Sequence, residues 1–473
     1  MTPAELRLRL LRNGYAPLPL IGKAPNMKNW QAKADTNAGE IELWSSIWPD
    51  AKNTGALTRL MPTLDLDIYS EDAARAAEEF VRTNHEEHGA EEKLREPETP
   101  TQPVTPGTID ETLTVFQRWL ILDDLTPVYA VLGTVAANYL DGDPVWLGVI
   151  GPPSSAKTEI LNSVSMLPKV VQSATVTVAG LLSGTPKKQQ HSAAKGGLLR
   201  QIGDFGIIAL KDFTSVLSMH TETRAEVLAA LREIFDGKWT RHIGSDGGRT
   251  LDWKGKVGLV FACTAVLDSH YGVIGSMGDR FLLSRMTPAG NGQFKRALVH
   301  VGPKSKQMRK ELAEAVARLF AGRRAEPQPI SDDETDEIDR TILLAVRLRG
   351  TVERDPRSRE IENIPGAEGP ARIGLALERL LAGLDTLGVN RATALDVVKA
   401  VALDSVPPNR LRAYRLLAAE DAGEIVTGDI AKAMGLPTIT TRRVLEDLTA
   451  YGLIERLPQG KGKPDKWTRS PWE

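Results

Sequence analysis

The chain has 473 residues, more than one folding unit usually contains, which predicts three or four domains. Its 59 lysine and arginine residues nearly balance 61 aspartate and glutamate residues, so any nucleic-acid binding must come from local basic patches. The single cysteine, Cys263, excludes an intrachain disulfide and fits a reducing, cytoplasmic compartment. Because no cleavable leader is visible and no apolar run approaches the roughly 20 residues of a membrane helix, we expect no membrane partner.

The first predicted module covers residues 1–84. Its segments GYAPLPLIGKAPNMKNW, KNTGALT and PTLDLDIYS resemble the opening of bifunctional primase-polymerase domains of archaeo-eukaryotic type. The resemblance implies that Asp65 and Asp67 match the first metal-binding acid pair of those domains. No glycine-rich segment with a catalytic histidine follows, and no third acid in strand context, although two-metal nucleotidyl transfer needs further ligands. We therefore interpret the module as a degenerate fragment that docks or positions DNA, with primase activity as the alternative.

Proline-rich and acidic composition marks two further boundaries, a linker at residues 85–110 and an acidic stretch at 322–339. They predict a central domain over residues 111–321, and an acidic linker with a helical connector over 322–408. The central domain alternates the apolar runs VWLGVI, FGIIAL and KVGLVFACT with helical stretches. This alternation predicts an α/β fold with a buried parallel sheet.

The strand predicted at residues 145–150 runs into GPPSSAKT and then into helix-forming residues, the context of a phosphate loop. We expect its backbone amides to bind phosphate oxygens, Lys157 to reach the β- and γ-phosphates, and the Thr158 hydroxyl to ligate Mg²⁺. Ala156 replaces the usual second glycine, and we expect the site to tolerate this because a methyl group is small. The predicted ATP-binding residues are Gly151, Pro152, Pro153, Ser154, Ser155, Ala156, Lys157 and Thr158.

A phosphate loop also needs a carboxylate at the end of a neighbouring strand. Asp212 is the only acid at the end of the strand predicted at residues 207–210, so we assign it to Mg²⁺ binding and catalysis, with Glu233 as a candidate helper. The alternative for Asp212 is a helix N-cap. Thr264 ends the next strand and is predicted to contact the γ-phosphate or the attacking water, with ordinary strand chemistry as its alternative.

Two arginines follow this predicted sensor strand in the segment SMGDRFLLSRM. The planar guanidinium group suits a bidentate grip on developing phosphoryl charge. We predict that Arg280 is a catalytic finger presented to the nucleotide of a neighbouring subunit. For both Arg280 and Arg285 the alternative is a surface ion pair.

Residues 238–256 read as two β-rich runs around a Gly-Ser-Asp-Gly-Gly turn, which predicts a hairpin. Trp239 and Trp253 interleave with basic side chains, a combination suited to phosphate contact and base stacking. The alternative is a hairpin whose tryptophans pack on the domain. The basic segment 185–197 is a second candidate DNA contact or an unstructured loop. The predicted DNA-binding residues of the hairpin are Lys238, Arg241, His242, Arg249 and Lys254.

The last predicted domain covers residues 409–473. A helix, then TGDIAKAMGL, a turn, TITTRRVLEDLTAYGLI and a Gly-Lys-rich hairpin resemble a winged helix-turn-helix. The resemblance implies that the second helix of the motif faces a groove of duplex DNA and that the hairpin forms the wing. Because the net positive charge of the block is small, a winged helix that docks protein is the alternative. The predicted DNA-binding residues here are Thr440, Thr441, Arg442, Arg443, Lys461 and Lys463.

Taken together, GPPSSAKT, LKDFTSVL, the basic hairpin and MGDRF resemble the AAA+ ATPases of phages, plasmids and integrated elements, which are related to superfamily III and minichromosome-maintenance-like helicases. The resemblance covers residues 115–287. It implies a hexameric ring that hydrolyses ATP with Mg²⁺ and moves single-stranded DNA past the hairpin in its pore, while the winged helix binds duplex.

The expected fold class is therefore α/β, with a P-loop AAA+ core, a small α+β N-terminal module, a helical connector and a C-terminal winged helix-turn-helix. The expected function is that of an ATP-dependent DNA helicase or replication initiator of a mobile element. Two alternatives stay open: an ATP-switched regulator or helicase loader without motor activity, and a primase-polymerase with an accessory ATPase.

Overall fold

The computed structural model describes most of the chain in separate stretches. They are residues 3–12, 16–21, 24–25, 36–49, 53–57, 105–183, 197–243, 249–271, 280–287, 303–367, 369–419, 423–460 and 462–471. The chain forms two compact units, Met1–Arg95 and Glu96–Glu473. None of the helices within the described stretches is long and apolar enough to cross a lipid bilayer.

In its described residues, the first unit combines two helices with a three-stranded antiparallel sheet of order β2-β1-β3. Asn37 starts the second helix with a capping box, because its side chain accepts from the Glu40 amide while the Glu40 carboxylate accepts from the Asn37 amide. The rest of the predicted module and most of the predicted linker, from residue 58 to residue 104, lie outside the described residues. The elements are α1 (Pro3–Arg12), β1 (Ala16–Ile21), β2 (Ala24–Pro25), α2 (Ala38–Ile47) and β3 (Asn53–Leu57).

The second unit has an α/β fold built on a five-stranded sheet of order β10-β4-β9-β6-β5, in which every neighbouring pair is parallel. The apolar runs that predicted strands form β4, β6 and β9, and their side chains are almost entirely buried, as expected of a parallel sheet covered by helices. The strands are β4 (Trp146–Ile150), β5 (Val170–Ser173), β6 (Phe205–Leu210), β9 (Lys256–Cys263) and β10 (Phe281–Arg285).

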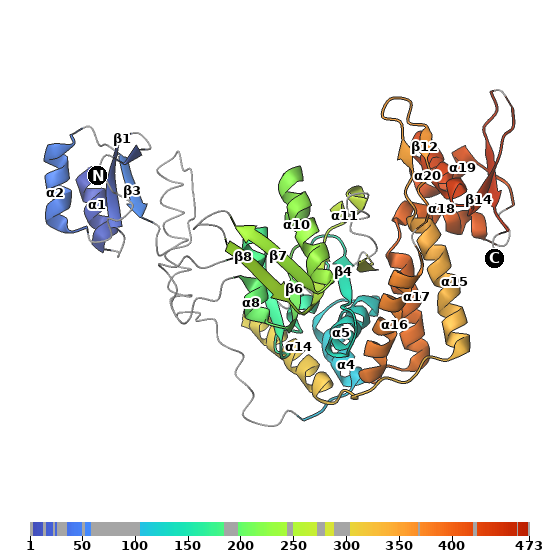
Figure 1. Cartoon of the computed structure of the whole chain (residues 1–473), viewed down its shortest axis with the longest axis horizontal. Coiled ribbons are helices and arrows are strands. Elements are labelled where there is room, and N and C mark those ends of the chain that lie inside the picture. The colour runs from blue at the N-terminus through green and yellow to red at the C-terminus, as the bar shows by residue number, and fades with distance from the viewer. Residues whose placement is uncertain are drawn as a thin grey trace. The chain divides into compact units, whose positions relative to one another are not determined.

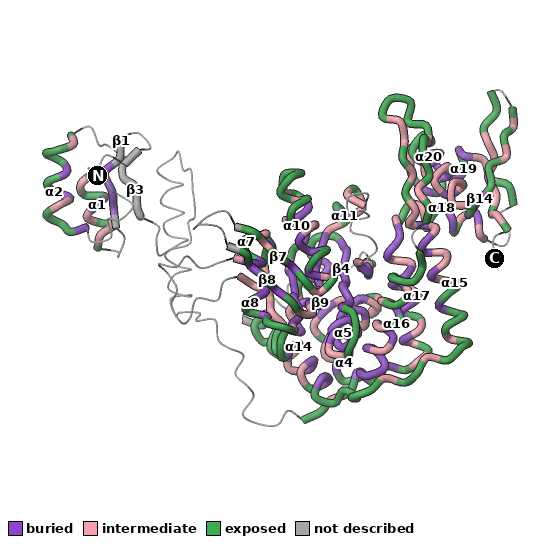
Figure 2. Tube along the Cα trace, in the orientation of Figure 1, coloured by how far each residue is buried: buried purple, intermediate pink, exposed green. Residues whose placement is uncertain are grey.

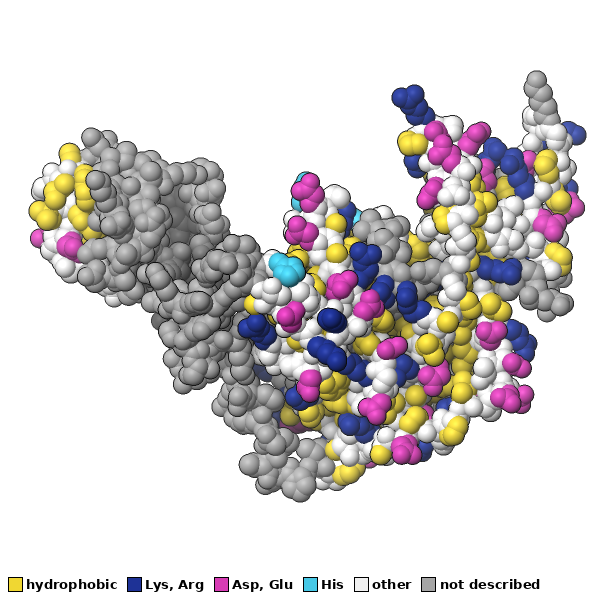
Figure 3. Space-filling view, in the orientation of Figure 1, with side chains coloured by type: hydrophobic (Ala, Val, Ile, Leu, Met, Phe, Trp, Pro, Cys, Tyr) yellow, Lys and Arg dark blue, Asp and Glu magenta, His cyan; other side chains and the backbone are white. Residues whose placement is uncertain are grey.

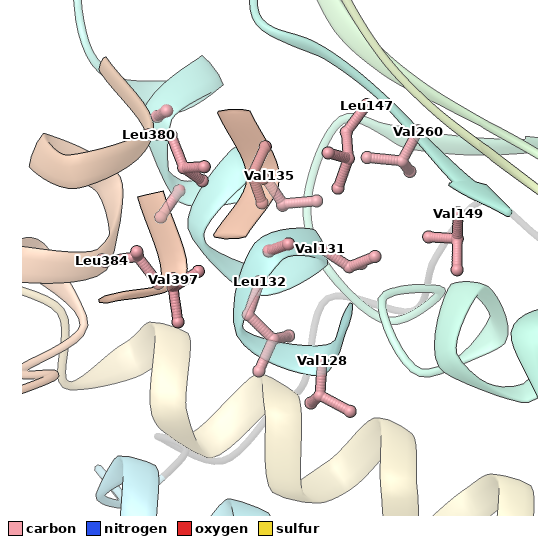
Figure 4. Close-up of a cluster of buried hydrophobic side chains, with 14 of the residues drawn as sticks. Val128, Val131, Leu132, Val135, Leu147, Val149, Val260, Leu380, Leu384 and Val397 are labelled. Atoms are coloured by element: carbon pink, nitrogen blue, oxygen red, sulfur yellow. The ribbon is translucent and has the colours of Figure 1, made fainter. Parts of the chain in front are cut away.

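The main apolar core lies between the sheet and a group of helices (Figure 4). Helix α5 (Thr126–Tyr139) is buried along most of its length and packs against α16 (Ala371–Thr386). The two helices approach so closely that a Cβ atom on Gly383 would lie 2.1 Å from the carbonyl oxygen of Gly133. Only glycine permits this approach, which brings residues 133 and 383 together and fixes the C-terminal helices against the sheet.

Further helices surround the sheet, and a two-stranded hairpin precedes β9 (Figure 1). Burial follows this layering, since the tube of α5 is largely buried whereas α14 and α15 have exposed stretches (Figure 2). The hairpin strands are β7 (Lys238–Ile243) and β8 (Arg249–Lys254). The helices are α4 (Ile109–Trp119), α6 (Lys157–Asn162), α7 (Val178–Leu181), α8 (Leu198–Ile202), α9 (Thr214–Leu217), α10 (Thr221–Phe235), α11 (Val266–Ser269), α14 (Pro303–Ala321) and α17 (Arg391–Asp404).

The predicted acidic linker at residues 322–339 is only partly a linker, because helix α15 (Asp332–Arg349) begins inside it. Ser331 forms a capping box with Glu334, and the acidic first turn faces the positive end of the helix dipole. The acidic run therefore marks a helix start. Two helices of the predicted helical connector over 322–408, α16 and α17, contribute to the apolar core that packs against the sheet.

The C-terminal group contains three helices and a three-stranded antiparallel sheet of order β13-β15-β14. Gly435 ends the second of these helices in a left-handed conformation with φ of 63°, and Trp467 is fully buried beneath the group. The elements follow one another in the order predicted for residues 409–473. They are α18 (Pro408–Ala418), β13 (Ile425–Val426), α19 (Thr427–Met434), α20 (Thr438–Ala450), β14 (Ile454–Leu457) and β15 (Lys466–Arg469).

One element beside this group was not predicted from the sequence. A short hairpin of β11 (Glu353–Arg354) and β12 (Ile361–Asn363) follows α15 and lies beside α20 (Figure 1). Its strands are too short to produce an alternating pattern, which explains why the sequence gives no strand signal there.

Candidate functional site

The predicted phosphate loop follows β4 in the interior of the sheet, where the ends of β9 and β10 flank it. Crevices at the carboxyl ends of parallel strands are the usual ligand sites of such sheets. Gly151 is needed at the start of the loop, because a Cβ atom there would lie 2.7 Å from Cβ of Met286. Ser154 and Ala156 both adopt left-handed backbone conformations, with φ of 62° and 65°. The loop thus uses backbone conformations that favour glycine at two positions where the residue is not glycine.

Lys157 lies at the mouth of this loop and is buried, with only 8% of the residue exposed. Its ammonium group donates to the carbonyl oxygens of Gly151 at 2.8 Å and Pro152 at 2.6 Å, and to the hydroxyl of Ser155 at 3.2 Å. Burial lowers the pKa of Lys157, and the nearby Cys263 and Asp212 oppose that shift. The loop carbonyls therefore hold the Lys157 ammonium group in place. Because they are neutral, a phosphate oxygen, which carries negative charge, can replace them as a stronger hydrogen-bond acceptor.

Asp212, Thr214 and Thr264 meet at the same edge of the sheet. One carboxylate oxygen of Asp212 accepts from the Thr214 amide at 2.9 Å, and Asp212 stays exposed. The N-cap of α9 is Phe213, so Asp212 does not take the N-cap position considered as its alternative. The Thr214 hydroxyl accepts from the Thr264 amide at 3.3 Å and lies 3.5 Å from the Thr264 hydroxyl. Thr214 therefore orients both predicted site residues, and its role was not predicted from the sequence.

This arrangement fits a triphosphate with Mg²⁺ in its donor chemistry. The amide groups of residues 154–156 meet no protein acceptor among the described residues, and the Thr158 side chain is exposed. The described stretches contain no group of three or more His, Cys, Asp or Glu side chains placed to hold a metal. A bound Mg²⁺ would therefore combine Thr158 and Asp212 with phosphate oxygens and water. Glu233, the candidate helper, is exposed on α10.

Arg280 precedes β10 and lies at the opposite edge of the sheet, since Phe281 pairs with Trp146 at the start of β4. A strand of five residues separates the two edges by about 15 Å. The Arg280 guanidinium binds both carboxylate oxygens of Asp236, at 2.9 and 3.0 Å, and lies 5.4 Å from the ring centre of Phe235. In the isolated chain Arg280 therefore makes an ion pair, away from its own phosphate loop.

Arg285, at the other end of β10, joins three segments of the unit. Its guanidinium forms a bidentate ion pair with Asp268, at 2.7 and 3.0 Å, and donates to the carbonyl of Asp404 at 2.8 Å. Its backbone amide donates to the Asp404 carboxylate at 2.7 Å, and burial raises the pKa of that carboxyl to about 6. Arg285 thus ties α11 and the end of α17 to the edge of the sheet that carries the loop.

The hairpin β7–β8 packs its tryptophans on the domain, so the interpretation that they stack on bases is wrong. Trp239 and Trp253 face each other across the strands and are 7% and 6% exposed. The Trp253 ring nitrogen donates to the carbonyl of Gly203 at 2.8 Å. Arg241, on the same face, donates to backbone carbonyls at both ends of α7 and is only partly exposed.

The opposite face of the hairpin is exposed and carries Lys238, His242 and Lys254. These three side chains remain available for phosphate contact. The side chain of Arg249 lies outside the described residues, as does most of the basic segment predicted at 185–197.

Some of the residues predicted to bind DNA in the C-terminal group are exposed on helix α20 and after β14. Thr440 and Arg442 are exposed, Arg443 is partly exposed, and Lys463 is exposed between β14 and β15. The prediction for Thr441 is wrong, because this residue is fully buried and its hydroxyl donates to the carbonyl of Pro437. Lys461 and the acid pair Asp65 and Asp67 lie outside the described residues.

Residues 7–138 match the family described as bifunctional DNA primase/polymerase, N-terminal. The matched range is less than half of the chain and continues past residue 84, the predicted end of the first module, into α4 and α5 of the second unit. The comparison with curated proteins found no match.

Among the solved structures that match the chain, two are described as the A form apo structure of the NrS-1 C-terminal region. They are 14% and 15% identical to the chain, cover 79% of it and 78% of their own chains, and have TM-scores of 0.29 and 0.27. TM-scores below 0.5 are not evidence of a shared fold.

Proposed function

We propose that this chain is an ATP-hydrolysing protein of DNA replication, with its nucleotide bound at the loop after β4. The observation that supports this best is the convergence of Lys157, Asp212 and Thr264 at one edge of the parallel sheet. Phosphoryl transfer depends on positioning and on charge stabilisation rather than on covalent participation of the protein. The family match over residues 7–138 supports the link to DNA replication.

In this proposal Lys157 exchanges the loop carbonyls for phosphate oxygens of ATP, and burial strengthens its interaction with them. Thr158 and Asp212 hold Mg²⁺, which neutralises phosphate charge. Asp212, held by the Thr214 amide, also orients the attacking water. Thr264, held by the Thr214 hydroxyl, contacts that water or the γ-phosphate.

We further propose that the active form is a hexameric ring with the AAA+ arrangement. The position of Arg280 at the far edge of the sheet supports a contribution to a neighbouring subunit's site. The exposed face of the hairpin β7–β8 would then line a pore for single-stranded DNA, and the C-terminal group would act as a winged helix on duplex DNA. An ATP-switched regulator or loader is the alternative, in which ATP controls assembly rather than movement.

Lys157→Met tests the proposal, because methionine keeps the side-chain length and removes the charge. We expect ATP hydrolysis and unwinding of a forked duplex to fall by about 100-fold or more, while DNA affinity is retained. Lys310→Met, on the exposed surface of α14, is the matched control and should leave both activities unchanged. Folded wild-type protein that neither binds nor hydrolyses ATP would disprove the proposal. Hydrolysis without unwinding would favour the regulator or loader.

A second candidate function is nucleotidyl transfer by the N-terminal module, which the family match over residues 7–138 favours. Asp65 and Asp67 would then bind the metal ions. Primer synthesis or extension by the wild-type chain, lost in Asp65→Ala and kept in Lys157→Met, would establish it independently of the ATPase.

A further inference from the structure

The hairpin β11–β12 is fixed to helix α20 by one shielded arginine. Arg354 forms ion pairs with Glu446 at 2.9 Å and Asp447 at 2.7 Å, and donates to the carbonyl of Arg443 at 3.1 Å. Its side chain is only 12% exposed, so these charge-assisted hydrogen bonds are little weakened by water. The hairpin is therefore held against the same helix that was predicted to read DNA.

Tyr451, just after α20, provides a second attachment. Its hydroxyl lies 2.6 Å from the carbonyl oxygen of Thr351 and 2.7 Å from that of Pro365, on either side of the hairpin, and its single proton is shared between these two acceptors. A Cβ atom on Gly350 would lie 2.3 Å from the tyrosine ring, so the ring packs directly against the chain as it enters the hairpin. With both ends held, the hairpin and α20 form one surface.

A groove of about 780 Å³ lies between the hairpin and α20. Four arginines and two glutamates line it. Glu446 is paired with Arg354 and Arg442, and Arg456 is paired with Asp465 at 2.7 Å. Ile439 of α20 and Ile364 after β12 add apolar surface and are 68% and 48% exposed. Lys and Arg side chains are visible at the end of the hairpin and in the region of α19 and α20 (Figure 3). The charged lining consists of Arg359, Arg442, Arg443, Arg456, Glu360 and Glu446.

Arg359 is held in the hairpin turn in a left-handed conformation, with φ of 64°. Its amide donates to the carbonyl of Asp355, and its own carbonyl accepts from Arg354. Glycine or asparagine would occupy this backbone region at lower cost, and such strain persists where surrounding contacts enforce it. The turn therefore presents a long cationic side chain at a position where local backbone preference alone would favour another residue, and that side chain is exposed.

We propose that this groove holds a phosphate backbone of duplex DNA, with the hairpin β11–β12 as a second arm beside α20. Excess arginine charge favours a polyanion, and neither Arg359 nor Arg443 has an acidic partner in the described part of the chain. The apolar surface of Ile439, near the start of α20, suits contact with thymine methyl groups. The inference rests on the duplex-binding part of the proposed function and does not require ATP hydrolysis.

Arg359→Gly tests this inference, because glycine removes the cation and also relieves the left-handed strain, so the fold is not at risk. The measurement is fluorescence anisotropy of a labelled duplex with full-length protein, without nucleotide, at several salt concentrations. We expect the dissociation constant to rise roughly three- to tenfold and the salt dependence to fall by about one phosphate contact. Arg340→Ala, an equal loss of charge on the exposed face of α15, should change neither quantity.

Arg443→Ala should weaken binding in the same way from the opposite wall of the groove. Loss of affinity in Arg443→Ala with unchanged affinity in Arg359→Gly would overturn the role of the hairpin. An equal effect of Arg340→Ala would also overturn it, because the contribution would then be general charge. Wild-type protein that hydrolyses ATP without binding duplex would disprove DNA binding in the groove and leave the proposed ATPase standing. Duplex binding without hydrolysis would disprove the proposed ATPase and leave the groove proposal standing.

Discussion

Ala156 shows how the proposed phosphate loop keeps its path with an alanine at the position where such loops usually have glycine. Its φ of 65° lies in the left-handed region, where an L-residue costs roughly 1 kcal/mol or more. Strain of this size persists only where other contacts enforce it. The bonds from the Lys157 ammonium to the carbonyls of Gly151 and Pro152 are such contacts, because they tie the end of the loop to its beginning.

Ala156→Gly should therefore raise the free energy of unfolding by up to about 1 kcal/mol, since glycine adopts this conformation without the steric cost. Chemical denaturation measures the change. Ala376→Gly in the regular helix α16 is the matched control and should lower the free energy of unfolding by about 1 kcal/mol. Equal losses in both variants would show that the loop is not strained at residue 156.

Residue positions could be predicted from the sequence wherever a local pattern determines them. Lys157, Asp212 and Thr264 each follow an apolar strand, and the carboxyl ends of parallel strands share one edge, so their meeting was predictable. Thr214 was missed because its position depends on the turn after the strand. Thr441 was misplaced although the helical period puts it on the face of Leu445, and that face packs into the core.

Among the elements, the hairpin β7–β8 shows that composition alone is a poor guide to which side chains face solvent. Alternation along a strand puts Trp239 and Arg241 on one face and Lys238 and His242 on the other. The tryptophan face packs into the second apolar cluster of the unit. The period was present in the sequence, but only the packing partner decides which face is buried, and the supporting residues of α7 and α8 are distant along the chain.

Removing Lys238 and Lys254 together should reduce the stimulation of ATP hydrolysis by single-stranded DNA several-fold and leave basal hydrolysis and thermal stability unchanged, because both side chains are exposed. Arg241→Ala should instead lower the melting temperature, because it removes the donor to the Leu182 carbonyl at the end of α7 and a second contact to the Val178 carbonyl. Basal and DNA-stimulated hydrolysis, measured beside thermal unfolding, separate the two effects. Unchanged stimulation in Lys238→Ala/Lys254→Ala would remove the outer face from the DNA path.

At the scale of the whole molecule, Arg285 connects two regions of the second unit. It lies where the strands of the parallel sheet end, beside the loop after β4, and contacts the end of α17, which leads into the C-terminal group. Its contacts with Asp268 and Asp404 join segments more than one hundred residues apart, and α18 begins shortly after Asp404. The Met286 amide donates to the carbonyl of Ile150, directly before the proposed phosphate loop. An ion pair was the alternative expected for Arg285 from the sequence, but its partners could not be predicted, because contacts at this separation have no local signature. In the proposed function, this connection is a physical route between the proposed nucleotide site and the proposed DNA site.

The ion pair between Arg280, just before β10, and Asp236 of the same chain allows a test of assembly. If that ion pair is the whole role of Arg280, Arg280→Ala and Asp236→Ala should lower stability by similar amounts and change ATP hydrolysis equally. If Arg280 also serves a neighbouring site, Arg280→Ala should lower hydrolysis by about 1,000-fold, whereas Asp236→Ala should retain it.

Mixing Lys157→Met with Arg280→Ala subunits should then restore some activity, because a mixed ring contains junctions that join an intact loop to an intact arginine. Equal effects of the two single variants, with no recovery on mixing, would mean that each chain hydrolyses ATP without its neighbour.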